Sequence, residues 1–349
     1  AIAGAALLLV LAAPVLGLQL GFPDAGNDRE GTTTRAAYEL VEEGFGAGAN
    51  GPLLLAGTLP DPGAAAELPA VRERLRTVED VAFVGPPRVN PQGDAALLLV
   101  VPRSSPQDDA TVQLVHRLRD DVLPAVARDG GIKLLVGGNT AAFIDQSEYI
   151  AGRLPLFIAA VVGLSFLLLV VTFRAPVVAL KAALMNLLSV GAAYGVIAFV
   201  AKGGAVGSLF GIDVETPIAP FIPVLMFAIL FGLSMDYEVF LLSRVREEYL
   251  RHGNTAAAVT DGLARTARVI TAAAAIMIVV FLAFLVADEV FLKLIGIGMA
   301  TAILVDATIV RMVLVPAVMQ LLGNRNWWMP AWLDRALPRV HVEPPAKVS

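Results

Sequence analysis

Six long apolar runs constrain this chain more than any other feature of its sequence. Each run approaches or exceeds the ~20 residues that a helix needs to cross about 30 Å of hydrocarbon. Only 16% of the 349 residues are charged, whereas a soluble domain averages about 25%. We therefore predict an integral membrane protein with an α-helical bundle of six transmembrane helices. The predicted spans are residues 1–21, 154–173, 176–201, 218–243, 269–287 and 290–322.

The composition excludes several classes of function. The chain has no cysteine, which rules out disulfides, thiolate catalysis and cysteine metal sites. Its three histidines, His116, His252 and His341, are too far apart in sequence to form a metal motif. The net charge of -5 does not indicate nucleic-acid binding, and neither a nucleotide-binding motif nor a hydrolase motif occurs. We expect no cofactor, no metal, no nucleic-acid partner and no enzymatic activity.

Basic residues in the loops predict the orientation. The loop 244–268 carries five arginines, whereas the opposite short loops offer only Lys202 and Lys293. Lys181 and Arg174 flank the turn after the second span, on the arginine-rich side. The positive-inside rule places these segments of a multi-pass membrane protein in the cytoplasm. The five spans within 154–322 form a bundle whose loop 244–268 is cytoplasmic. Counting crossings from that loop then places 22–153 outside the cytoplasm and the tail 323–349 inside it. That tail also includes Arg325, Arg335, Arg339 and Lys347.

Two features concern the ends of the chain. All three tryptophans lie within 326–333, and because tryptophan favours the membrane interface we expect an interfacial segment there; partner binding is the alternative. The first residue is Ala1, inside an apolar run that no charged region precedes. That is a poor signal peptide, so we expect the chain to be a fragment of a longer protein.

The segment 22–153 has the pattern of a folded domain. From residue 52 onward the predicted order is β-α-β-β-α-β, which is the ferredoxin-like split pattern of an α+β domain. The strands are expected at 52–57, 81–84, 95–101 and 132–136, and the helices at 64–77 and 108–127.

Asp236 is the first candidate for chemistry. It lies within the 218–243 span, and a carboxylate at membrane depth costs roughly 2.5–3.5 kcal/mol. Burial disfavours its charged form and so favours proton binding. We interpret Asp236 as a proton site; permanent pairing with a cation is the alternative. Its neighbours one turn away are Gly232, which would let another helix approach closely, and Phe240.

Two neighbours of Asp236 are also polar. The Tyr237 hydroxyl can relay a proton or hold a partner on another helix, although a tyrosine here more often serves packing. Glu238 lies nearly opposite Asp236 on the helix. We expect Glu238 to extend to the membrane interface.

Asp306 and Arg311 form a second polar pair in the last span. A spacing of five leaves them roughly 140° apart on an α-helix, so an ideal ion pair within the helix is not expected. Each should instead meet a partner on a neighbouring helix. Arg311 can also reach a lipid headgroup, and for Asp306 a functional role and a structural ion pair remain equally open.

The longest stretch around Asp236 resembles a family hallmark. The string FGLSMDYEVFLLSRVREEY at 231–249 is similar to that of the MMPL family (mycobacterial membrane protein large) of the resistance–nodulation–division superfamily. The string VDATIVRMVLVPA at 305–317 and the pair Trp327-Trp328 add to the resemblance. The similarity covers essentially the whole chain.

The resemblance implies a transporter half. Family members have two similar halves, each with one helix, an external porter domain and five more helices. This chain resembles the C-terminal half of such a twelve-helix protein, whose N-terminal half would be its missing partner. The implied function is proton-motive-force-driven export of lipids, hydrophobic compounds or drugs across the bacterial inner membrane. Membrane lipids are further partners, and a homo-oligomer is one candidate assembly.

The resemblance also implies roles for residues. Asp236 and Tyr237 match the relay pair that meets an equivalent pair from the other half in the family. Asp306 and Arg311 match two further residues implicated in function. Without the other half the relay would be incomplete, so this chain alone should not transport.

Two alternatives share parts of this pattern. A protein-export accessory related to SecDF would use the same architecture and proton coupling but act on polypeptides. A lipid sensor or scaffold of the sterol-sensing type would not transport and would tolerate loss of Asp236.

Overall fold

The structure, a computed structural model, describes residues 2–337 and divides into two compact units. Leu20–Gly152 and Thr216–Pro220 form an α/β unit, and the remaining residues form a helical unit. The predictions for Arg339, His341, Lys347 and the end of the tail at 338–349 lie outside the described residues.

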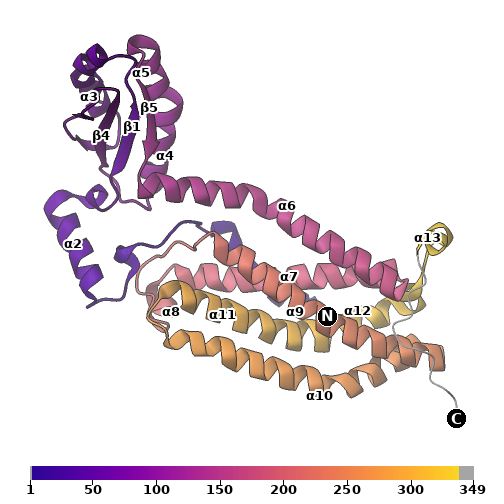
Figure 1. Ribbon diagram of the computed structural model, residues 1–349. Coiled ribbons are helices and arrows are strands. Elements are labelled where there is room, and N and C mark those ends of the chain that lie inside the picture. Colours follow the sequence, from indigo (N-terminus) through magenta and orange to yellow (C-terminus); the bar gives the residue numbers. More distant parts are fainter. Residues whose placement is uncertain (1, 338–349) are drawn as a thin grey trace. The chain divides into compact units, whose positions relative to one another are not determined.

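Long apolar helices make up the helical unit (Figure 1). Five segments within residues 2–337 are long and apolar enough to cross a membrane. The first four are α6 (Asn139–Phe173), α7 (Pro176–Ala201), α9 (Phe221–His252), and α10 (Thr255–Leu282) with η6 (Ala283–Val286). The fifth consists of α11 (Val290–Val305), the π-helical η7 (Asp306–Leu314), α12 (Val315–Leu322) and η8 (Gly323–Trp327).

The first predicted span is the exception. Residues 1–21 contain α1 (Ile2–Ala12) and η1 (Ala13–Gly17), which together are shorter than a membrane crossing requires. The short helix α8 (Gly204–Ser208) follows α7. The chain therefore has an apolar helical bundle with five candidate membrane helices, and the sixth remains a prediction.

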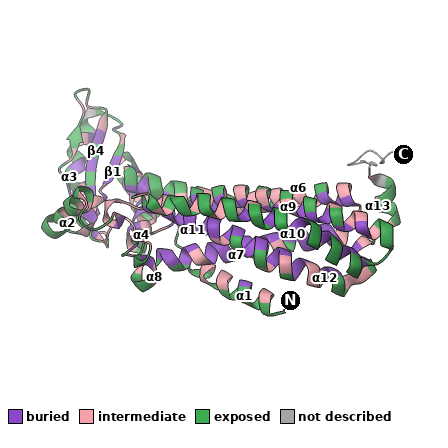
Figure 2. Ribbon diagram, turned by 90° about the horizontal axis from the view of Figure 1, so that it is seen from below, coloured by how far each residue is buried: buried purple, intermediate pink, exposed green. Residues whose placement is uncertain are grey.

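Helix α7 lies at the centre of the bundle. In its most apolar window 61% of the residues are buried, against 11% for α6 and for α10 (Figure 2). Small residues allow this close packing: a Cβ at Gly195 would overlap the carbonyl oxygen of Leu11. The bundle therefore has buried helix faces that can hold charge and outer faces that are open.

The arginine-rich loop predicted at 244–268 is mostly helical. It is the end of α9 and the start of α10, joined by a tight turn at Gly253, where φ is 66°. The Asn254 side chain caps α10 by accepting from the backbone N–H groups of Ala256 and Ala257. The predicted spans ended early here because their boundaries followed hydropathy, which charged residues lower without ending a helix.

The segment from η8 to α13 (Ala331–Ala336) packs back onto this end of the bundle. Trp327 stacks on Tyr249 with ring centroids 5.1 Å apart, and Arg246 lies 5.7 Å above the Trp327 ring. In α13, Asp334 pairs with Arg174 at the turn between α6 and α7. Trp327 is therefore partly covered by protein, whereas Trp328 and Trp332 are exposed.

The α/β unit contains one antiparallel sheet in the strand order β2-β4-β1-β5, with β3 paired to β4. With α3 between β1 and β2, and α4 to α5 between β4 and β5, this is the order of the split β-α-β-β-α-β pattern. The strands are β1 (Leu53–Thr58), β2 (Val81–Val84), β3 (Arg88–Val89), β4 (Ala95–Pro102) and β5 (Lys133–Gly137). The helical segments are η2 (Ala25–Asn27), α2 (Thr33–Phe45), η3 (Ala47–Asn50), η4 (Pro62–Glu67), α3 (Leu68–Arg76), α4 (Asp109–Arg117), η5 (Leu118–Val122) and α5 (Leu123–Gly130).

Alternation along the strands separates the two faces of this sheet. Leu53 and Leu55 are fully buried in the core beneath α3 to α5. On the other face Leu54 lies opposite Leu99, and both are exposed. The unit therefore has one core, on the helix-covered face of its sheet.

Candidate functional site: a buried charge cluster and an open carboxylate

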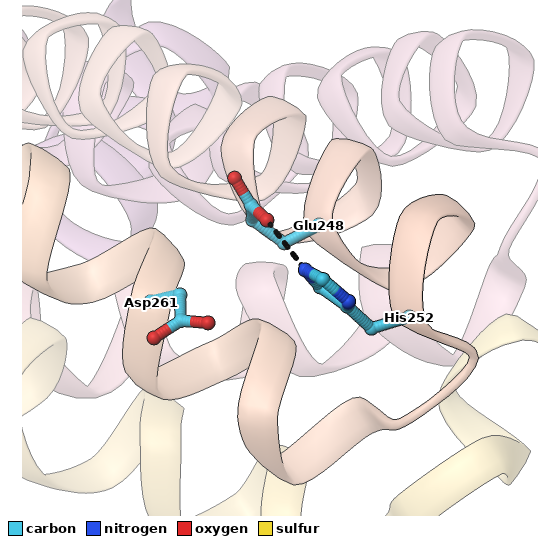
Figure 3. A group of neighbouring side chains, drawn as sticks. All are labelled: Glu248, His252 and Asp261. Carbon is cyan, nitrogen blue, oxygen red and sulfur yellow. Dashed lines mark ion pairs between the residues drawn. The ribbon is translucent and has the colours of Figure 1, made fainter.

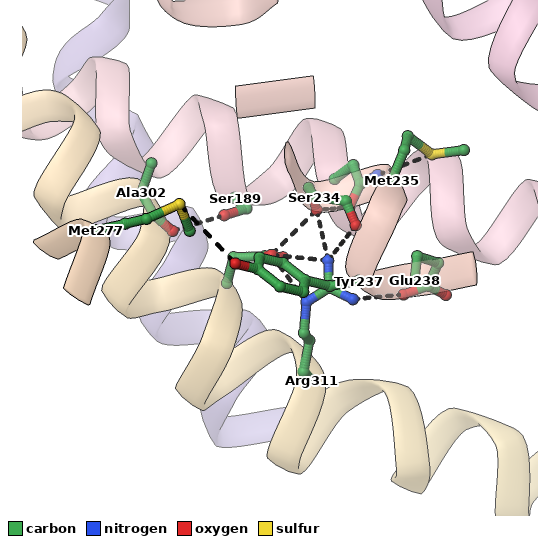
Figure 4. Close-up of polar contacts among 10 residues, drawn as sticks. Ser189, Ser234, Met235, Tyr237, Glu238, Met277, Ala302 and Arg311 are labelled. Carbon is green, nitrogen blue, oxygen red and sulfur yellow. Dashed lines mark hydrogen bonds and ion pairs between the residues drawn. The ribbon is translucent and has the colours of Figure 1, made fainter. Parts of the chain in front are cut away.

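Arg311 is the centre of the polar cluster inside the helical unit (Figure 4). It lies in η7 and is fully buried. Its Nε donates to Asp306 Oδ2 at 2.9 Å, and its Nη1 lies 3.4 Å from Glu238 Oε2. Its Nη2 donates to the carbonyl oxygen of Ser234 and, at 2.8 Å, to the Ser234 hydroxyl. The guanidinium thus joins η7 to α9 through Glu238 and Ser234, and it pairs with Asp306 within η7 itself.

Ser234 extends this network to α7. Its hydroxyl lies 2.6 Å from Asn186 Oδ1 and 3.0 Å from Asp306 Oδ2, and it donates its proton to one of these acceptors. Asn186 and Ser234 are both buried. Three elements, α7, α9 and η7, therefore share one hydrogen-bonded cluster.

The direct contact between Asp306 and Arg311 corrects the expectation from their spacing. On an α-helix, residues five apart do not face each other. Residues 306–314 form a π-helix, in which the backbone hydrogen bonds run from i to i+5. This wider turn brings residue 311 over residue 306, so the ion pair forms within one helix. The error was the assumption of α-helical geometry.

Glu238 and Lys181 are two further members of the cluster that sequence reasoning placed elsewhere. Glu238 was expected at the membrane interface but is only 2% exposed, because it lies on the same face of α9 as Ser234. Lys181 was expected to flank a loop but is 5% exposed, within α7, where it is attracted by the Glu238 carboxylate. The signal available in the sequence was the four-residue spacing from Ser234 to Glu238.

The charges of the cluster balance. Arg311 and Lys181 are cations, and Asp306 and Glu238 are anions, so the four side chains carry no net charge when all are ionised. Arg311 is paired directly with both carboxylates, which is how buried charge is tolerated in low dielectric. Lys181 forms no ion pair within residues 2–337 and is attracted to Glu238 only at longer range.

The hydrogen bonding of the cluster is less complete than its charge balance. Within residues 2–337, Lys181 Nζ, Glu238 Oε1 and Asp306 Oδ1 are buried without a hydrogen-bond partner. A cavity of about 20 Å³ borders Asp306, Ser234 and Tyr237, and that volume is enough for one water molecule. The cluster thus combines fixed ion pairs with polar atoms able to accept or donate a further hydrogen bond.

Tyr237 contacts the cluster through its ring. The Arg311 guanidinium lies 5.4 Å from the ring centroid, within the range of a cation–π interaction. The Tyr237 hydroxyl lies 3.9 Å from Met277 Sδ, a weak acceptor. Of the predicted relay residues, the structure thus brings Tyr237, Asp306 and Arg311 together.

Asp236 lies outside this cluster. With Gly232 and Phe240, each four residues away, it lies on a face of α9 that is exposed in the structure. Within residues 2–337, Asp236 has no hydrogen-bond or ion-pair partner, and no atom lies within 4 Å of a Cβ added at Gly232. The expectations that Asp236 is buried and that Gly232 receives a neighbouring helix are therefore not met by this chain, because none of its described helices covers that face.

Comparison with known proteins identifies a family that the chain matches over most of its length. Positions 65–344 match the model of the MMPL family. The chain is 40% identical over 97% of its length to membrane protein YdfJ of Bacillus subtilis, of which it covers 46%. It is 39% identical over 99% of its length to the mycolic acid-containing lipids exporter MmpL11 of Mycolicibacterium smegmatis, of which it covers 36%.

A third relative carries a different description. The chain is 38% identical over 99% of its length to the heme uptake protein MmpL11 of Mycobacterium tuberculosis, of which it covers 36%. The chain therefore spans less than half the length of these curated relatives.

Proposed function

The chain belongs to the MMPL family, and on that premise we propose that it is one half of a proton-driven exporter of lipids or other hydrophobic compounds. Asp236 is the carboxylate that binds the transported proton. Asp306, Arg311 and Tyr237 form the fixed polar surroundings next to which its charge changes. The other half of the transporter lies in the remaining length that the relatives possess.

One observation carries this proposal: Asp236 has no partner among residues 2–337 although it sits in the middle of an apolar helix. A carboxylate at membrane depth is costly and usually marks an ion or substrate pathway. The two cations of the neighbouring cluster, Arg311 and Lys181, are buried on the inner side of α9, whereas Asp236 lies on its exposed face and pairs with neither. A proton is the simplest species that can neutralise this carboxylate reversibly.

The open face of α9 supports the half-transporter part of the proposal. Ala228, Gly232, Asp236 and Phe240 recur at every fourth residue and are all exposed. Small residues on such a face allow a second helix to approach closely. We assign this face to a helix of the other half, which would bury Asp236 and supply its hydrogen-bond partner.

The arrangement in the membrane follows from the loop charges. The C-terminal end of α9 and the N-terminal end of α10 carry the arginines and are assigned to the cytoplasm. The α/β unit is then extracytoplasmic and serves as the porter domain. Residues 2–17 are assigned as the sixth membrane helix of this half. Protonation of Asp236 from the outside and release to the cytoplasm would then change the packing of α9 in each transport cycle.

The cargo class rests on the relatives. One relative is described as an exporter of mycolic acid-containing lipids and another as a heme uptake protein. Both cargoes are large and hydrophobic. We therefore propose a lipid or another hydrophobic compound as cargo, with export as the direction.

The test uses the whole protein reconstituted in proteoliposomes with an imposed pH gradient. Asp236→Asn should fold and insert yet lose gradient-driven movement of a fluorescent lipid, because the amide cannot carry the proton. Asp288→Asn, the same change at an exposed turn of this unit, should transport normally. Gradient-driven transport by Asp236→Asn at the unmodified rate would refute the role of Asp236. Parallel assays with a drug and a secreted polypeptide would identify a different cargo class.

A further inference from the structure

A second group of ligand-type side chains lies at the turn between α9 and α10 (Figure 3). Glu248 and His252 are one turn apart on α9, and Asp261 faces them from α10. One ligand atom from each of the three lies within 4.8 Å of the other two. The four-residue spacing explains why the two α9 side chains share a face.

The geometry of this group suits a transition-metal ion. Glu248 Oε2 and His252 Nε2 are 3.5 Å apart. In a tetrahedral zinc site with bonds of about 2.0–2.1 Å, neighbouring ligand atoms are about 3.4 Å apart. The α9 pair already has this separation. His252 and Asp261 are both exposed, so a rotation of the Asp261 side chain would bring the third ligand atom closer without movement of the helices.

Glu248 makes only long contacts with its neighbouring arginines, so a metal ion could bind its carboxylate more tightly than they do. Its side chain is 4% exposed, yet its nearest cations are long contacts: Arg251 at 3.3 Å and Arg265 at 3.4 Å. Charge-assisted hydrogen bonds are usually about 2.7–2.9 Å long. Arg251 makes its short contact, 2.5 Å, with Glu247 instead, and Arg265 is largely exposed. Arg251 thus has a second and shorter partner, and Arg265 lies at the surface, where water can replace its contact with Glu248 when a metal binds.

We infer that Glu248, His252 and Asp261 bind one divalent transition-metal ion, with Zn²⁺ the best match. One imidazole nitrogen and two carboxylate oxygens are a zinc-type ligand set, and water completes the tetrahedron. Imidazole argues against Mg²⁺ and Ca²⁺, which take oxygen ligands. The ion would fasten the end of α9, the helix that carries Asp236, to α10 across the Gly253 turn. The histidines looked isolated in the sequence because the other two ligands are carboxylates.

The test measures metal binding directly and does not use transport. The whole protein, purified without a histidine tag and stripped with a chelator, is titrated with Zn²⁺ by calorimetry and with Co²⁺ by visible absorption. We expect one site, with the strong visible bands of tetrahedral Co²⁺. His252→Ala should abolish saturable binding, and Asp261→Asn should weaken it by about tenfold or more. Both residues are exposed, so neither change should disturb folding.

The two remaining histidines supply matched controls. His116→Ala and His341→Ala should leave both titrations unchanged. Undiminished Zn²⁺ affinity in His252→Ala would overturn the site, and so would equal loss in His341→Ala. Weak, octahedral-type Co²⁺ absorption would overturn the tetrahedral ligand set. Zn²⁺ should also raise the thermal unfolding midpoint of the unmodified protein but not that of His252→Ala; an equal rise in both would count against the site.

Discussion

The two faces of α9 differ in whether their charged side chains are paired. On the inner face, Ser234 and Glu238 belong to a cluster in which each anion has a cation, centred on the fully buried Arg311. On the outer face, Asp236 has no partner within residues 2–337 and is flanked by Gly232 and Phe240. Asp236 and Glu238 are only two positions apart in the sequence, so the turn of the helix itself creates the contrast.

This difference separates a charge that supports the fold from a charge that is available for function. Paired charges in low dielectric connect neighbouring helices. Removing one partner leaves the other as an uncompensated buried charge, which destabilises the fold. An unpaired carboxylate contributes nothing to the fold of the described chain and costs free energy in lipid. The inner face should therefore respond to mutation through stability, and the outer face through transport.

The largest effect should come from Arg311. Arg311→Met keeps the volume but leaves Asp306 and Glu238 buried without their cation. We expect the whole protein to lose about 3–5 kcal/mol of stability, the usual cost of breaking a buried ion pair from one side. The measurement is the midpoint of thermal or denaturant unfolding in detergent. Arg268→Met, at an exposed position of α10, is the control and should change little; equal effects would remove the distinction between the two kinds of site.

Glu238→Gln should have the next largest effect. The amide keeps the shape and can still accept from Arg311, but it removes one of two negative charges. We expect a loss of about 1.5–3 kcal/mol, the scale of a hydrogen bond to a charged group. A double-mutant cycle with Lys181→Met would show whether Lys181 and Glu238 act together. Additive effects in that cycle would mean that the electrostatic attraction between them does not matter for stability.

Gly232→Leu tests the outer face directly, because the change in unfolding free energy has opposite signs for a face packed against a helix and a face in contact with lipid. If a helix of the other half packs on the outer face, the added side chain should destabilise the whole protein by about 1–3 kcal/mol. If the face contacts lipid, leucine should stabilise α9 by about 0.5–1 kcal/mol, since glycine is a poor helix former. Our proposal requires the first outcome. Gly195→Ala, where a Cβ would overlap the carbonyl oxygen of Leu11, should destabilise the protein in either case.

Much of the fold was predictable from the sequence because its signals are local. Hydropathy located 176–201 as a span, and α7 has those bounds. Alternation and turn residues located the strands of the α/β unit within one or two residues of β1, β2, β4 and β5. The membrane class and the MMPL family likewise followed from apolar runs and the string around Asp236, and both are confirmed.

The cluster was less predictable because it depends on contacts between distant segments and on one local irregularity. Nothing in the spacing of Asp306 and Arg311 reveals that residues 306–314 widen into a π-helix. Lys181 and Glu238 are 57 positions apart, and only the packing of α7 against α9 brings their charges into range. The exposure of Asp236 could not be anticipated either, because a single helix does not reveal which of its faces is covered.

The smallest stability effect should be that of Asp236→Asn, although its effect on transport should be complete. The carboxylate has no partner within residues 2–337, so its removal breaks no contact of the described chain. In the whole protein the Asn side chain can still accept the hydrogen bond that we assign to the other half, so we expect the unfolding free energy to fall by no more than about 1 kcal/mol. Asp306→Asn is the matched change on the inner side and should destabilise the protein more, because it removes the negative charge of the buried ion pair with Arg311. A loss of stability in Asp236→Asn as large as that of Asp306→Asn would mean that Asp236 is a structural ion-pair partner in the whole protein, and the outer face of α9 would then resemble the inner one.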